Sequence, residues 1–525
     1  MTQHNILING QWRQADAERE FSPMNPNTGE PLTDVYPVST WSDVDQALTA
    51  AREAFAELQN ISRGTIAKFL NDYASAIEEN ASSLVEMAHL ETGLPTSPRL
   101  ADVEIPRTVG QLRQAANAAA DASWTQPTID SANNIRSMLQ GIGPVAVFGP
   151  NNFPYAFGSA SGGDFAAAIC AGNPVIAKSN SSHPGTTRLF AELAHKAAQN
   201  NGLPAATVQL IYATSRESGY KLVSDHRLGA TGFTGSRTAG LALKEAADKA
   251  GIPIYLELSS VNPVVVLQGA LTQQSEAIAT EFTGSCTMAA GQLCTKPGLL
   301  VVPQGQAGDE FVASVAEKFA DAPVGTLLNM HAAGQIKDTA TKLIEAGAHL
   351  HTSSVVPNEA RFCQTNTLMS VTGDKFIQNP ELFQTEMFGN ASLIIRSENT
   401  AQTIAIVNSL EGNLTGCIYS DANGSDDSDY DAIAPALTVK VGRMINDKMP
   451  TGVAVSPAMN HGGPFPSSGH PGFTAVGLPA SAKRFGALKC FDGVRENRLP
   501  DVLQNTNPSD NIWRLIDGKW TTANL

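Results

Sequence analysis

The amino-acid sequence predicts an α/β fold with parallel sheets, and three observations support this class. Short β-branched runs such as "VAVFG", "PVIAKS" and "VQLIYA" alternate with helical stretches from residue 143 onward. This alternation is typical of βαβ units with helices on both faces of a sheet. The chain has 525 residues, more than one compact core holds, so two or three domains are expected. Its 42% hydrophobic and 16% charged residues are ordinary for a globular protein.

Both ends of the sequence predict tight β-hairpins. Asn-Gly joins strand-like residues in "LINGQW" (residues 7–12), and Asp-Gly does so in "LIDGKW" (residues 515–520). Such two-residue loops favour the turns that match the twist of paired strands. Six matching positions are too few for a repeat, so we expect two independent hairpins.

The elements between the hairpins follow in order along the chain. From Trp41 to about Thr92, apolar residues recur at three- and four-residue spacings, which predicts helices. A first strand and helix series then extends to "IPIYLEL" and "NPVVVL", and a second one, with "PGLLVVP" and "ASLIIRS", follows Cys294. The segment "NHGGPFPSSGHPG" (residues 460–472) predicts a long loop that closes the second region.

Charge and composition exclude several classes of protein. The formal net charge of −15 argues against nucleic acid as a partner, because a phosphate backbone needs a basic surface. No apolar run approaches the roughly 20 residues that span a bilayer, so no membrane partner is expected. The start "MTQHNILING" does not look like a secretory signal, so a cytoplasmic location is expected. The six cysteines lack CxxC or Cys/His ligand spacing, so neither a disulfide framework nor a metal site is predicted.

Cys294 in "MAAGQLCTKPG" is either a packing residue or a nucleophile, and the segment alone favours packing. Cys286, eight residues earlier, is the rival thiol; it lacks the Gly-Gln lead-in and is interpreted as packing. Among the residues that flank Cys294, only Lys296 has a charge that could activate a thiol.

Two glycine- or lysine-bearing motifs allow a nucleotide site. Gly235 and Gly240 in "GATGFTGSRTAG" lie at a strand-to-helix junction, where glycine backbone and a helix N-terminus can hold a phosphate. Lys178 in "VIAKSNSSHPG" ends a strand, at the edge where doubly wound sheets bind ligands. When each motif is considered alone, a structural role is favoured over nucleotide binding. The glycines then form a turn without a ligand, and Lys178 is a solvated surface lysine.

Two further motifs carry polar groups at strand ends. Asn152 in "GPNNFPYAF" follows the first strand of the series, where its amide either donates to a developing oxyanion or holds a turn. Glu257 in "IYLELSSVNP" lies in an otherwise apolar strand, where a carboxylate costs free energy unless it is partnered. It is therefore either a general base or exposed at a sheet edge.

The order of "NNFP", "AKSNS", "GFTGSRTAG", "LELSSVNP", "GQLC", "EMFGN" and "HGGPFPSS" resembles the NAD(P)-dependent aldehyde dehydrogenase superfamily across nearly the whole chain. The "AGQLCTKPG" block, the spacing around Asn262-Pro263 and the tail "NIWRLIDGKW" look most like its 2-oxoglutarate semialdehyde (2,5-dioxovalerate) dehydrogenase branch. The resemblance implies a Rossmann-type cofactor domain, a second α/β catalytic domain and a small β oligomerisation arm. The implied boundaries are 1–122, 143–258 and 458–485 for the cofactor domain, 259–457 for the catalytic domain, and 123–142 and 486–525 for the arm and tail.

By this resemblance, three residues have catalytic roles. Cys294 matches the nucleophile that attacks the aldehyde carbonyl, and the Asn152 amide with the Cys294 backbone N–H would hold the oxyanion. Glu257 matches the general base that activates water to hydrolyse the resulting thioester. The small residues 289–291 are then interpreted as room for a cofactor or substrate beside the thiol.

The resemblance also implies a dinucleotide site. Ser181 stands where many NAD-using members carry a glutamate that repels a 2′-phosphate, and Arg216 matches an arginine that some NADP-preferring relatives aim at that phosphate. NADP is therefore predicted as the cofactor, with NAD possible. The other implied contacts are Lys178 to the adenosine ribose, Gly235, Ser236 and Gly240 near the pyrophosphate, and Glu386 and Phe388 to the nicotinamide ribose and ring.

Some residues depart from the family pattern. Ser259 and Ser260 replace two glycines after the glutamate, which leaves the backbone there less free. Asn390 replaces a proline after the Phe-Gly of "EMFGN". Neither change touches the nucleophile or the base.

An anionic substrate would need a cation in its channel. Arg107 in "EIPRTVGQLR" lies on a helix that by analogy could line that channel, together with Phe153. Arg136 and Arg484 are further candidates, and a surface or structural role is the alternative for each arginine.

The sequence thus predicts NADP-dependent oxidation of an aldehyde to a carboxylic acid through a cysteine thiohemiacetal and thioester, with 2-oxoglutarate semialdehyde converted to 2-oxoglutarate. One alternative is a broad-specificity aliphatic or other semialdehyde dehydrogenase. Another is a cysteine hydrolase or acyltransferase without redox chemistry. A non-catalytic relative is disfavoured because it has no chemical reason to keep Cys294, Glu257 and Asn152 together. The terminal hairpins and the tail suit a homodimer or homotetramer.

Overall fold

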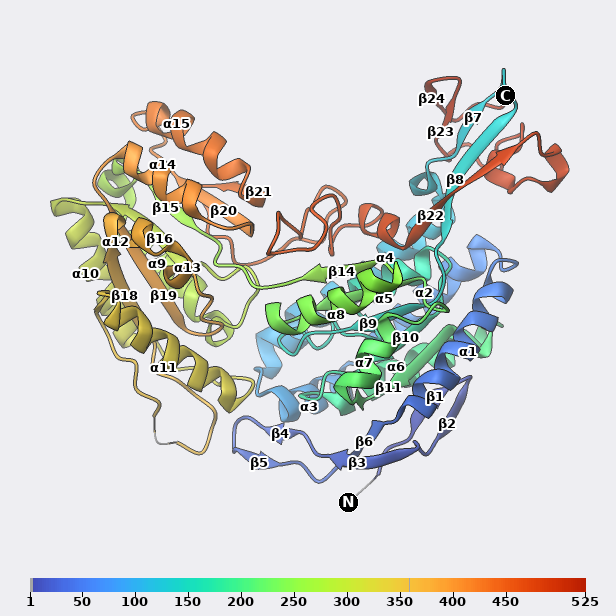
Figure 1. Ribbon diagram of the computed structural model, residues 1–525, viewed down its shortest axis with the longest axis horizontal. Helices are drawn as coiled ribbons and strands as arrows, with labels where there is room; N and C mark the ends of the chain where they lie inside the picture. The colour runs from blue at the N-terminus through green and yellow to red at the C-terminus, as the bar shows by residue number, and fades with distance from the viewer. Residues whose placement is uncertain (1–2, 358) are drawn as a thin grey trace.

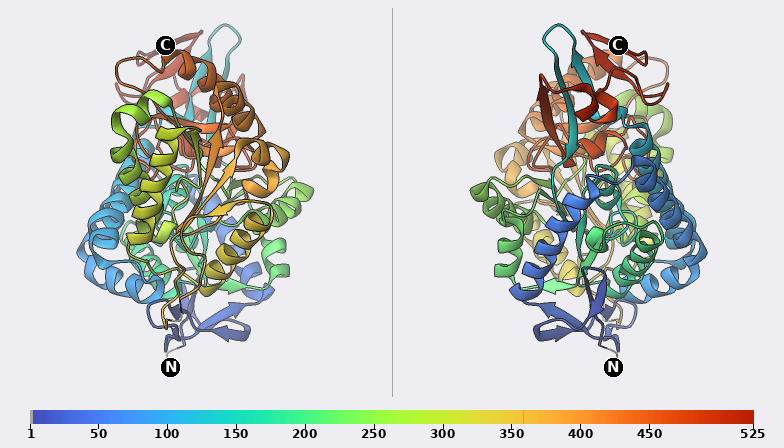
Figure 2. Two further views of the ribbon diagram at one scale, coloured as in Figure 1. Left: turned by 90° about the vertical axis from the view of Figure 1, so that its left-hand side faces the viewer. Right: turned by 90° about the vertical axis from the view of Figure 1, so that its right-hand side faces the viewer.

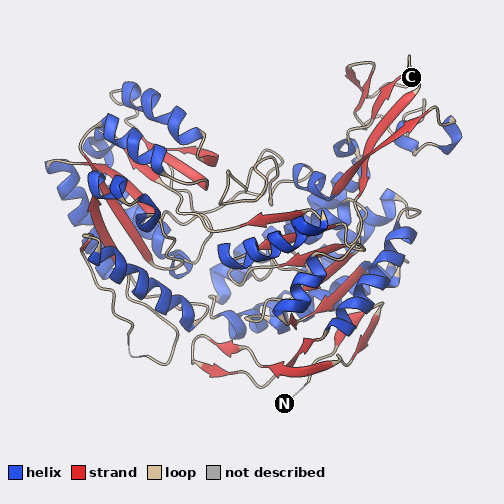
Figure 3. Ribbon diagram, viewed as in Figure 1, coloured by secondary structure: helices blue, strands red, loops and turns tan. Residues whose placement is uncertain are grey.

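The computed structural model describes residues 3–357 and 359–525, which form two α/β lobes and a projecting β arm (Figure 1). Figure 3 shows that each lobe contains a central sheet with helices packed against it. The predicted α/β class with parallel sheets is confirmed. Within this described part of the chain, none of the helices has the length and apolar character that crossing a bilayer requires.

The first lobe is built on a seven-stranded sheet with the order β14-β13-β9-β10-β11-β1-β2. The five consecutive strands from β14 to β11 are parallel, and the predicted N-terminal hairpin adds two antiparallel strands at the opposite edge from β14. The hairpin turn has φ values of 49° at Asn9 and 73° at Gly10, which Asn-Gly adopts readily. The strands are β1 (Ile6–Ile8), β2 (Gln11–Arg13), β9 (Val145–Phe148), β10 (Val175–Lys178), β11 (Val208–Ile211), β13 (Ala230–Thr234) and β14 (Ile254–Glu257).

Helices pack around this sheet at the positions that the apolar spacing predicts. The predicted helical region from residue 41 to residue 92 is confirmed as three helices. A three-stranded sheet and a two-stranded ribbon lie beside the first lobe. The helices are α1 (Trp41–Leu58), α2 (Arg63–Glu79), α3 (Ala81–Thr92), α4 (Ile105–Asp121), α5 (Gly163–Cys170), α6 (Pro184–Asn200), α7 (Arg216–Val223) and α8 (Arg237–Ala250); the small strands are β3 (Ala17–Phe21), β4 (Met24–Asn25), β5 (Glu30–Pro31), β6 (Tyr36–Ser39) and β12 (Ala213–Thr214).

The second lobe has another seven-stranded sheet, ordered β17-β18-β19-β16-β15-β20-β21, in which only β17 is antiparallel to its neighbour. Successive residues of its central strand, "LLVVP", face two different apolar cores, so the strand is hydrophobic throughout. Its strands are β15 (Val264–Val266), β16 (Leu299–Pro303), β17 (His349–Leu350), β18 (Thr367–Thr372), β19 (Ala391–Ser397), β20 (Asn413–Tyr419) and β21 (Val441–Asn446); its helices are α9 (Gln268–Thr287), α10 (Gln306–Asp321), α11 (Met330–Glu345), α12 (Gly373–Gln378), α13 (Pro380–Phe383), α14 (Thr400–Ser409) and α15 (Asp427–Thr438).

The arm is a five-stranded sheet with the order β22-β8-β7-β23-β24, and it extends away from both lobes (Figure 2). The predicted C-terminal hairpin is its outer edge, with φ values of 46° at Asp517 and 81° at Gly518. The two terminal hairpins therefore have the same local structure but belong to different sheets. The arm strands are β7 (Thr128–Asp130), β8 (Ile135–Gly141), β22 (Gly486–Asp492), β23 (Arg514–Ile516) and β24 (Lys519–Thr521).

The predicted long loop covers the outer edge of β14. Leu258 N donates to Ser467 O at 2.8 Å, and Gly469 N donates to Leu256 O at 3.2 Å, so the loop pairs with the strand as an added edge. Glu257 is consequently only 5% exposed. The alternative of an edge-exposed Glu257 is wrong, because a distant loop closes that edge.

Candidate active site

The loop that carries Cys294 lies between the two lobes, just before β16. Its thiol is partly exposed. The side chain of the fully buried Asn262 donates from Nδ2 to Cys294 O and to Lys296 O, both at 2.9 Å. The "SSVNP" segment, which links the lobes, therefore fixes the backbone on both sides of the thiol.

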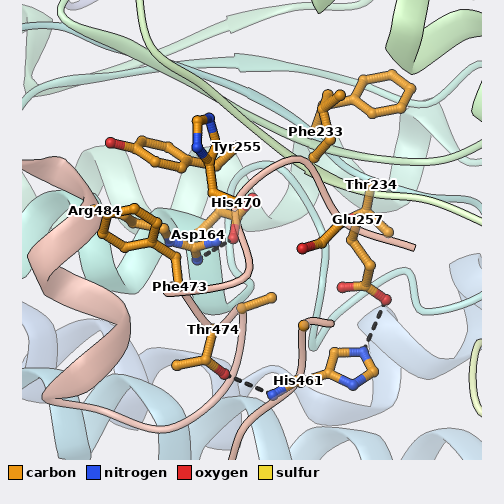
Figure 4. Close-up of a pocket in the computed structure, with 14 residues that line it drawn as sticks. Asp164, Phe233, Thr234, Tyr255, Glu257, His461, His470, Phe473, Thr474 and Arg484 are labelled. Carbon is orange, nitrogen blue, oxygen red and sulfur yellow. Dashed lines mark hydrogen bonds and ion pairs between the residues drawn. The ribbon is translucent and has the colours of Figure 1, made fainter. Parts of the chain in front are cut away.

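Three reactive side chains converge at this point. The Nε2 atom of His461 lies 3.4 Å from Cys294 Sγ and 2.8 Å from Glu257 Oε1. Figure 4 shows the imidazole facing the Glu257 carboxylate. His461 is 2% exposed and belongs to the loop that covers β14. The sequence reasoning missed it, and the only available signal was a histidine at the head of the "HGGPFPSS" motif.

The charge on His461 follows from its surroundings. Burial alone lowers the pKa of the ring, but Glu257 and Cys294 beside it outweigh that effect and raise the pKa to about 10. At neutral pH the ring is therefore an imidazolium that faces both the carboxylate and the sulfur.

Lys296 does not supply this charge. Its ammonium is buried and donates to Met387 O at 2.9 Å and to Ala391 O at 2.6 Å. Burial lowers its pKa, and the groups that oppose this effect are Cys286 and Glu386. Lys296, the one flanking residue whose charge could act on the thiol, instead bonds to the backbone of the "EMFGN" segment and of the strand that follows it.

The small residues before Cys294 serve backbone packing. A Cβ atom at Gly291, where φ is 70°, would lie 2.2 Å from Gly389 O. Ala290 is 4% exposed and belongs to the core of the second lobe. The interpretation of these residues as room for a ligand is corrected for two of them: Gly291 lets two backbone segments approach, and Ala290 fills a core.

Asn152 lies beside the Cys294 loop, as the oxyanion hypothesis requires. It is 5% exposed, and its Nδ2 donates at 2.9 Å to the carbonyl of Gln292, two residues before the thiol. A side-chain amide has a second N–H, which this bond does not use.

Cys286 lies on α9 in a different environment. It is fully buried, with Sγ 3.3 Å from Pro297 O and 3.2 Å from Ser392 Oγ. Burial raises the pKa of its thiol to about 12. This thiol packs in the core of the second lobe.

Several of the predicted cofactor residues lie at the carboxyl edge of the first sheet. Lys178 ends β10, in register with Ile211 at the end of β11, and burial lowers its pKa to about 8. Ser181 and Arg216 are both exposed in the segments that follow these two strands. The carboxyl edge of a parallel sheet is where such folds bind nucleotides.

The junction of β13 and α8 also fits a dinucleotide. A Cβ atom at Gly240 would lie 2.4 Å from Leu258 Cδ2, so glycine there lets α8 pack closely on the sheet. Gly235 precedes Ser236, whose hydroxyl accepts from Ala239 N at 3.4 Å and caps the helix. The exposed N-terminus of α8 thus faces the same edge as Lys178, which suits a pyrophosphate.

The remaining predicted cofactor residues, Glu386 and Phe388, belong to the second lobe. Burial raises the pKa of Glu386, and its Oε1 accepts from Ser260 N at 3.3 Å. The Ser260 hydroxyl contacts Asn262 and Asn413, and Asn390 bonds to Gln364 O and Asn366 Oδ1, both at 2.7 Å. Ser260 thus bonds to Asn262, which holds the backbone around Cys294, whereas Asn390 bonds to a neighbouring loop.

Two guanidinium groups lie on the Cys294 side of the site. Arg107 on α4 donates to Val453 O and lies 5.7 Å from the centre of the Phe157 ring. Arg443 on β21 donates to Pro450 O at 2.7 Å. For both arginines burial lowers the pKa, and Cys294 is the leading charge that opposes this shift. Arg443 was missed by the sequence reasoning, since nothing in its local sequence marks it.

The other candidates for the substrate channel take different places. Arg136 donates to Leu503 O and to Asn505 Oδ1 in the arm, and Arg484 pairs with Asp164 in the first lobe. Phe153 packs at 5.4 Å against Phe157, beside an apolar cluster that includes Val453, Val455 and Met459. Arg136 and Arg484 are therefore structural, whereas Phe153 lies near Arg107.

The fold defines the class of the protein first. The structure of aldehyde dehydrogenase C from Pseudomonas syringae, in complex with NAD+ and octanal, matches with a TM-score of 0.80 at 22% identity, covering 94% of this chain and 98% of that one. The predicted aldehyde dehydrogenase-like architecture is thereby confirmed.

Sequence relatives then give the family. Residues 12–465 match the Aldehyde dehydrogenase family. The chain is 38% identical over 507 residues to alpha-ketoglutaric semialdehyde dehydrogenase 2 of Azospirillum brasilense, covering 94% of this chain and 95% of that protein. It is 36% identical over 527 residues to alpha-ketoglutaric semialdehyde dehydrogenase of Acinetobacter baylyi, covering 98% of both. The chain belongs to the aldehyde dehydrogenase family, and the prediction of an NAD(P)-dependent oxidoreductase that acts on aldehydes is confirmed.

Proposed function

We propose that this enzyme oxidises 2-oxoglutarate semialdehyde to 2-oxoglutarate with NADP. The observation that carries the substrate is a pair of partly buried arginines, Arg107 and Arg443, which donate to Val453 O and Pro450 O of one loop segment and whose lowered pKa values Cys294 opposes. A short semialdehyde with a carboxylate at its far end would place that carboxylate near these cations while its carbonyl reaches the thiol. The two relatives named alpha-ketoglutaric semialdehyde dehydrogenases support the same choice.

In this proposal the Cys294 sulfur attacks the aldehyde carbon and forms a thiohemiacetal. The second N–H of the Asn152 amide, with the Cys294 backbone N–H, holds the oxygen that becomes negative. A nicotinamide cofactor bound at the edge that carries Lys178 would supply the acceptor for the hydride of this carbon. Glu257 then takes a proton from water, which hydrolyses the thioester and frees Cys294.

His461 contacts the reacting sulfur, so we assign it a catalytic role as well. Its imidazolium lies between two groups that work as anions, at 3.4 Å from Cys294 Sγ and 2.8 Å from Glu257 Oε1. A cation in this place would attract both groups and keep the carboxylate oriented before water arrives.

For the cofactor, the preference for NADP rests on Ser181 and Arg216. Both side chains are exposed near the edge where Lys178 ends its strand. Because residue 181 is a serine, no carboxylate there repels a 2′-phosphate, and the Arg216 guanidinium can attract it. We expect kcat/KM to favour NADP, and Ser181→Glu to shift the NADP-to-NAD ratio at least about tenfold toward NAD by like-charge repulsion. Comparable efficiency with both cofactors in the wild type would refute the preference.

The quaternary and domain organisation are parts of the same proposal. The arm exposes Leu488, Trp513 and Trp520, with 70%, 52% and 51% of their surface accessible, so it suits contact with a second copy in a homodimer or homotetramer. Light scattering before and after deletion of residues 486–525 tests this.

The separate sheets support the division into a cofactor domain (1–122, 143–258, 458–485), a catalytic domain (259–457) and an arm with a tail. We also propose a cytoplasmic location.

The substrate is tested with an aldehyde panel and both cofactors. The panel compares 2-oxoglutarate semialdehyde, succinic semialdehyde, and short aliphatic and aromatic aldehydes by the rise in NADPH absorbance. The highest kcat/KM is expected for 2-oxoglutarate semialdehyde. A flat profile would replace the narrow assignment with a broad-specificity enzyme, and ester turnover without redox change would favour the hydrolase alternative.

The arginine pair is tested separately. Arg107→Ala and Arg443→Ala should each raise KM for the semialdehyde about 10- to 100-fold, because each removes a charge-assisted contact to the carboxylate. Neutral aldehydes should be turned over as before. Arg113→Ala is the matched control. Arg113 lies on the same helix as Arg107, and its substitution removes only an exposed ion pair with Glu78. Equal losses for charged and neutral aldehydes would contradict the assignment.

A further inference from the structure

The cluster of Glu257, Cys294 and His461 has a second chemical capacity. We propose that these three side chains bind one zinc ion in the substrate-free enzyme, and that the bound ion excludes the aldehyde. His461 lies 204 residues after Glu257 and 167 residues after Cys294. No short ligand spacing in the sequence therefore reveals the site.

The geometry fits one ion. A carboxylate oxygen, the thiol sulfur and the imidazole Nε2 all lie within 4.8 Å of one another. Zinc binds sulfur at about 2.3 Å and nitrogen or oxygen at about 2.0–2.2 Å, so tetrahedral ligand atoms lie roughly 3.3–3.7 Å apart. The separation of Cys294 Sγ and His461 Nε2, 3.4 Å, is already in this range. The 2.8 Å between His461 Nε2 and Glu257 Oε1 must open by about half an ångström.

An independent observation also points to a ligand. The second carboxylate oxygen of Glu257, Oε2, is buried and has no hydrogen-bond partner among the described residues. A buried carboxylate oxygen without a partner costs free energy, and a metal ion would satisfy it. Figure 4 shows both oxygens of Glu257 on the side of the imidazole.

The charges balance at this site. Thiolate and carboxylate together neutralise a divalent ion, which matters because Arg107 and Arg443 make the surroundings positive. On binding, Zn–S, Zn–N and Zn–O bonds form, while the Cys294 thiol and His461 Nε2 give up any protons that they hold to solvent. Oxidation states do not change.

The site also has a way in and an open position. Cys294 is partly exposed, so the ion can reach the sulfur from the substrate side. Three protein ligands leave a fourth position for water, as in catalytic zinc sites. If the proposed roles of Cys294 and Glu257 hold, zinc occupies the nucleophile and the base together, and reversible inhibition follows.

Metal binding is tested without substrate or cofactor, so its outcome does not depend on the proposed reaction. Cobalt(II) replaces zinc as the probe, because a thiolate ligand gives it a charge-transfer band in the near ultraviolet and tetrahedral coordination gives visible bands. The wild-type enzyme should show both bands at one cobalt per chain, and zinc should displace the cobalt.

Variants identify the ligands. Cys294→Ala should abolish the charge-transfer band, and His461→Gln and Glu257→Gln should each weaken cobalt binding at least about tenfold. Cys286→Ala, which removes the buried thiol, and His351→Ala, which removes a histidine from an adjacent pair on the second lobe, should leave the band unchanged. Circular dichroism checks that each variant is folded.

A second measurement needs no variant. Zinc should protect Cys294 of the wild type from alkylation by iodoacetamide, and EDTA should restore both alkylation and aldehyde oxidation. The proposal is overturned if cobalt gives no sulfur band, if the band persists undiminished in His461→Gln, or if zinc leaves alkylation of Cys294 unchanged.

Discussion

Cys294 and Cys286 lie eight residues apart and have opposite surroundings. Cys294 is partly exposed on a loop between the lobes, with an imidazolium 3.4 Å from its sulfur. Cys286 is enclosed on α9, where its sulfur contacts a hydroxyl and a carbonyl, and burial raises its pKa to about 12. The difference teaches that partners from distant segments decide whether a thiol is reactive or packs.

The largest effect is expected from removing the reactive thiol. Cys294→Ala should lower kcat for aldehyde oxidation by more than about 1,000-fold, because no other thiol of the described residues lies in the cluster with Glu257 and His461. Steady-state NADPH formation measures this. Cys286→Ala, the matched control, should keep the wild-type kcat, and a comparable loss in that variant would break the distinction between the two thiols.

A smaller loss is expected when the cation beside Cys294 is removed. His461→Gln keeps a polar side chain of similar reach but no charge, so kcat should fall about 100-fold. Alkylation of Cys294 at neutral pH, followed by peptide mass spectrometry in the presence of EDTA, should slow as well. Equal alkylation rates in wild type and variant would show that His461 does not activate the thiol.

The same histidine predicts a pH dependence of stability. Its folded-state pKa, about 10, is above the ordinary value of about 6.5, so its stabilising contribution is fully present below about pH 6.5 and is lost as pH rises through 10. The difference in free energy of unfolding between wild type and His461→Gln should therefore shrink from pH 7 to pH 10. Urea unfolding in EDTA measures it, and a constant difference would contradict the ion-pair interpretation.

The smallest effect is expected at the packing thiol. Cys286→Ala should lower the free energy of unfolding by about 1–2 kcal/mol, because it removes a buried sulfur from the core of α9 and β16. Thermal unfolding followed by circular dichroism measures this. If Cys294→Ala lowered the free energy of unfolding more than Cys286→Ala, Cys294 and not Cys286 would be the packing thiol.

Local patterns in the sequence were sufficient for much of the fold. The alternation of β-branched runs with helical spacing, and the Asn-Gly and Asp-Gly turns, depend on residues that are close along the chain. The helices from Trp41 to Thr92, the parallel strands of the first sheet, three strands of the second sheet and the two hairpins were therefore predictable. The same patterns did not assign the hairpins to different sheets, since strand pairing is a contact over long sequence distances.

The site was predictable only in part, for the same physical reason. Cys294, Glu257 and Asn152 belong to motifs with a recognisable order, and the structure brings all three to one region. His461 reaches the thiol from a segment 167 residues later, so its proximity is a tertiary property. Lys296 is close to Cys294 in sequence but bonds to the backbone of another segment, because closeness in sequence does not fix the direction of a side chain.

The central claim is that Cys294 forms the covalent intermediate and Glu257 hydrolyses it. The most direct test mixes Glu257→Gln with 2-oxoglutarate semialdehyde and NADP and follows a single turnover, with mass spectrometry of the quenched protein. The account predicts one equivalent of NADPH per chain and an acyl group that accumulates on the peptide containing Cys294. NADPH formation without an acyl group on Cys294, or an acyl group on Cys286 instead, would contradict it.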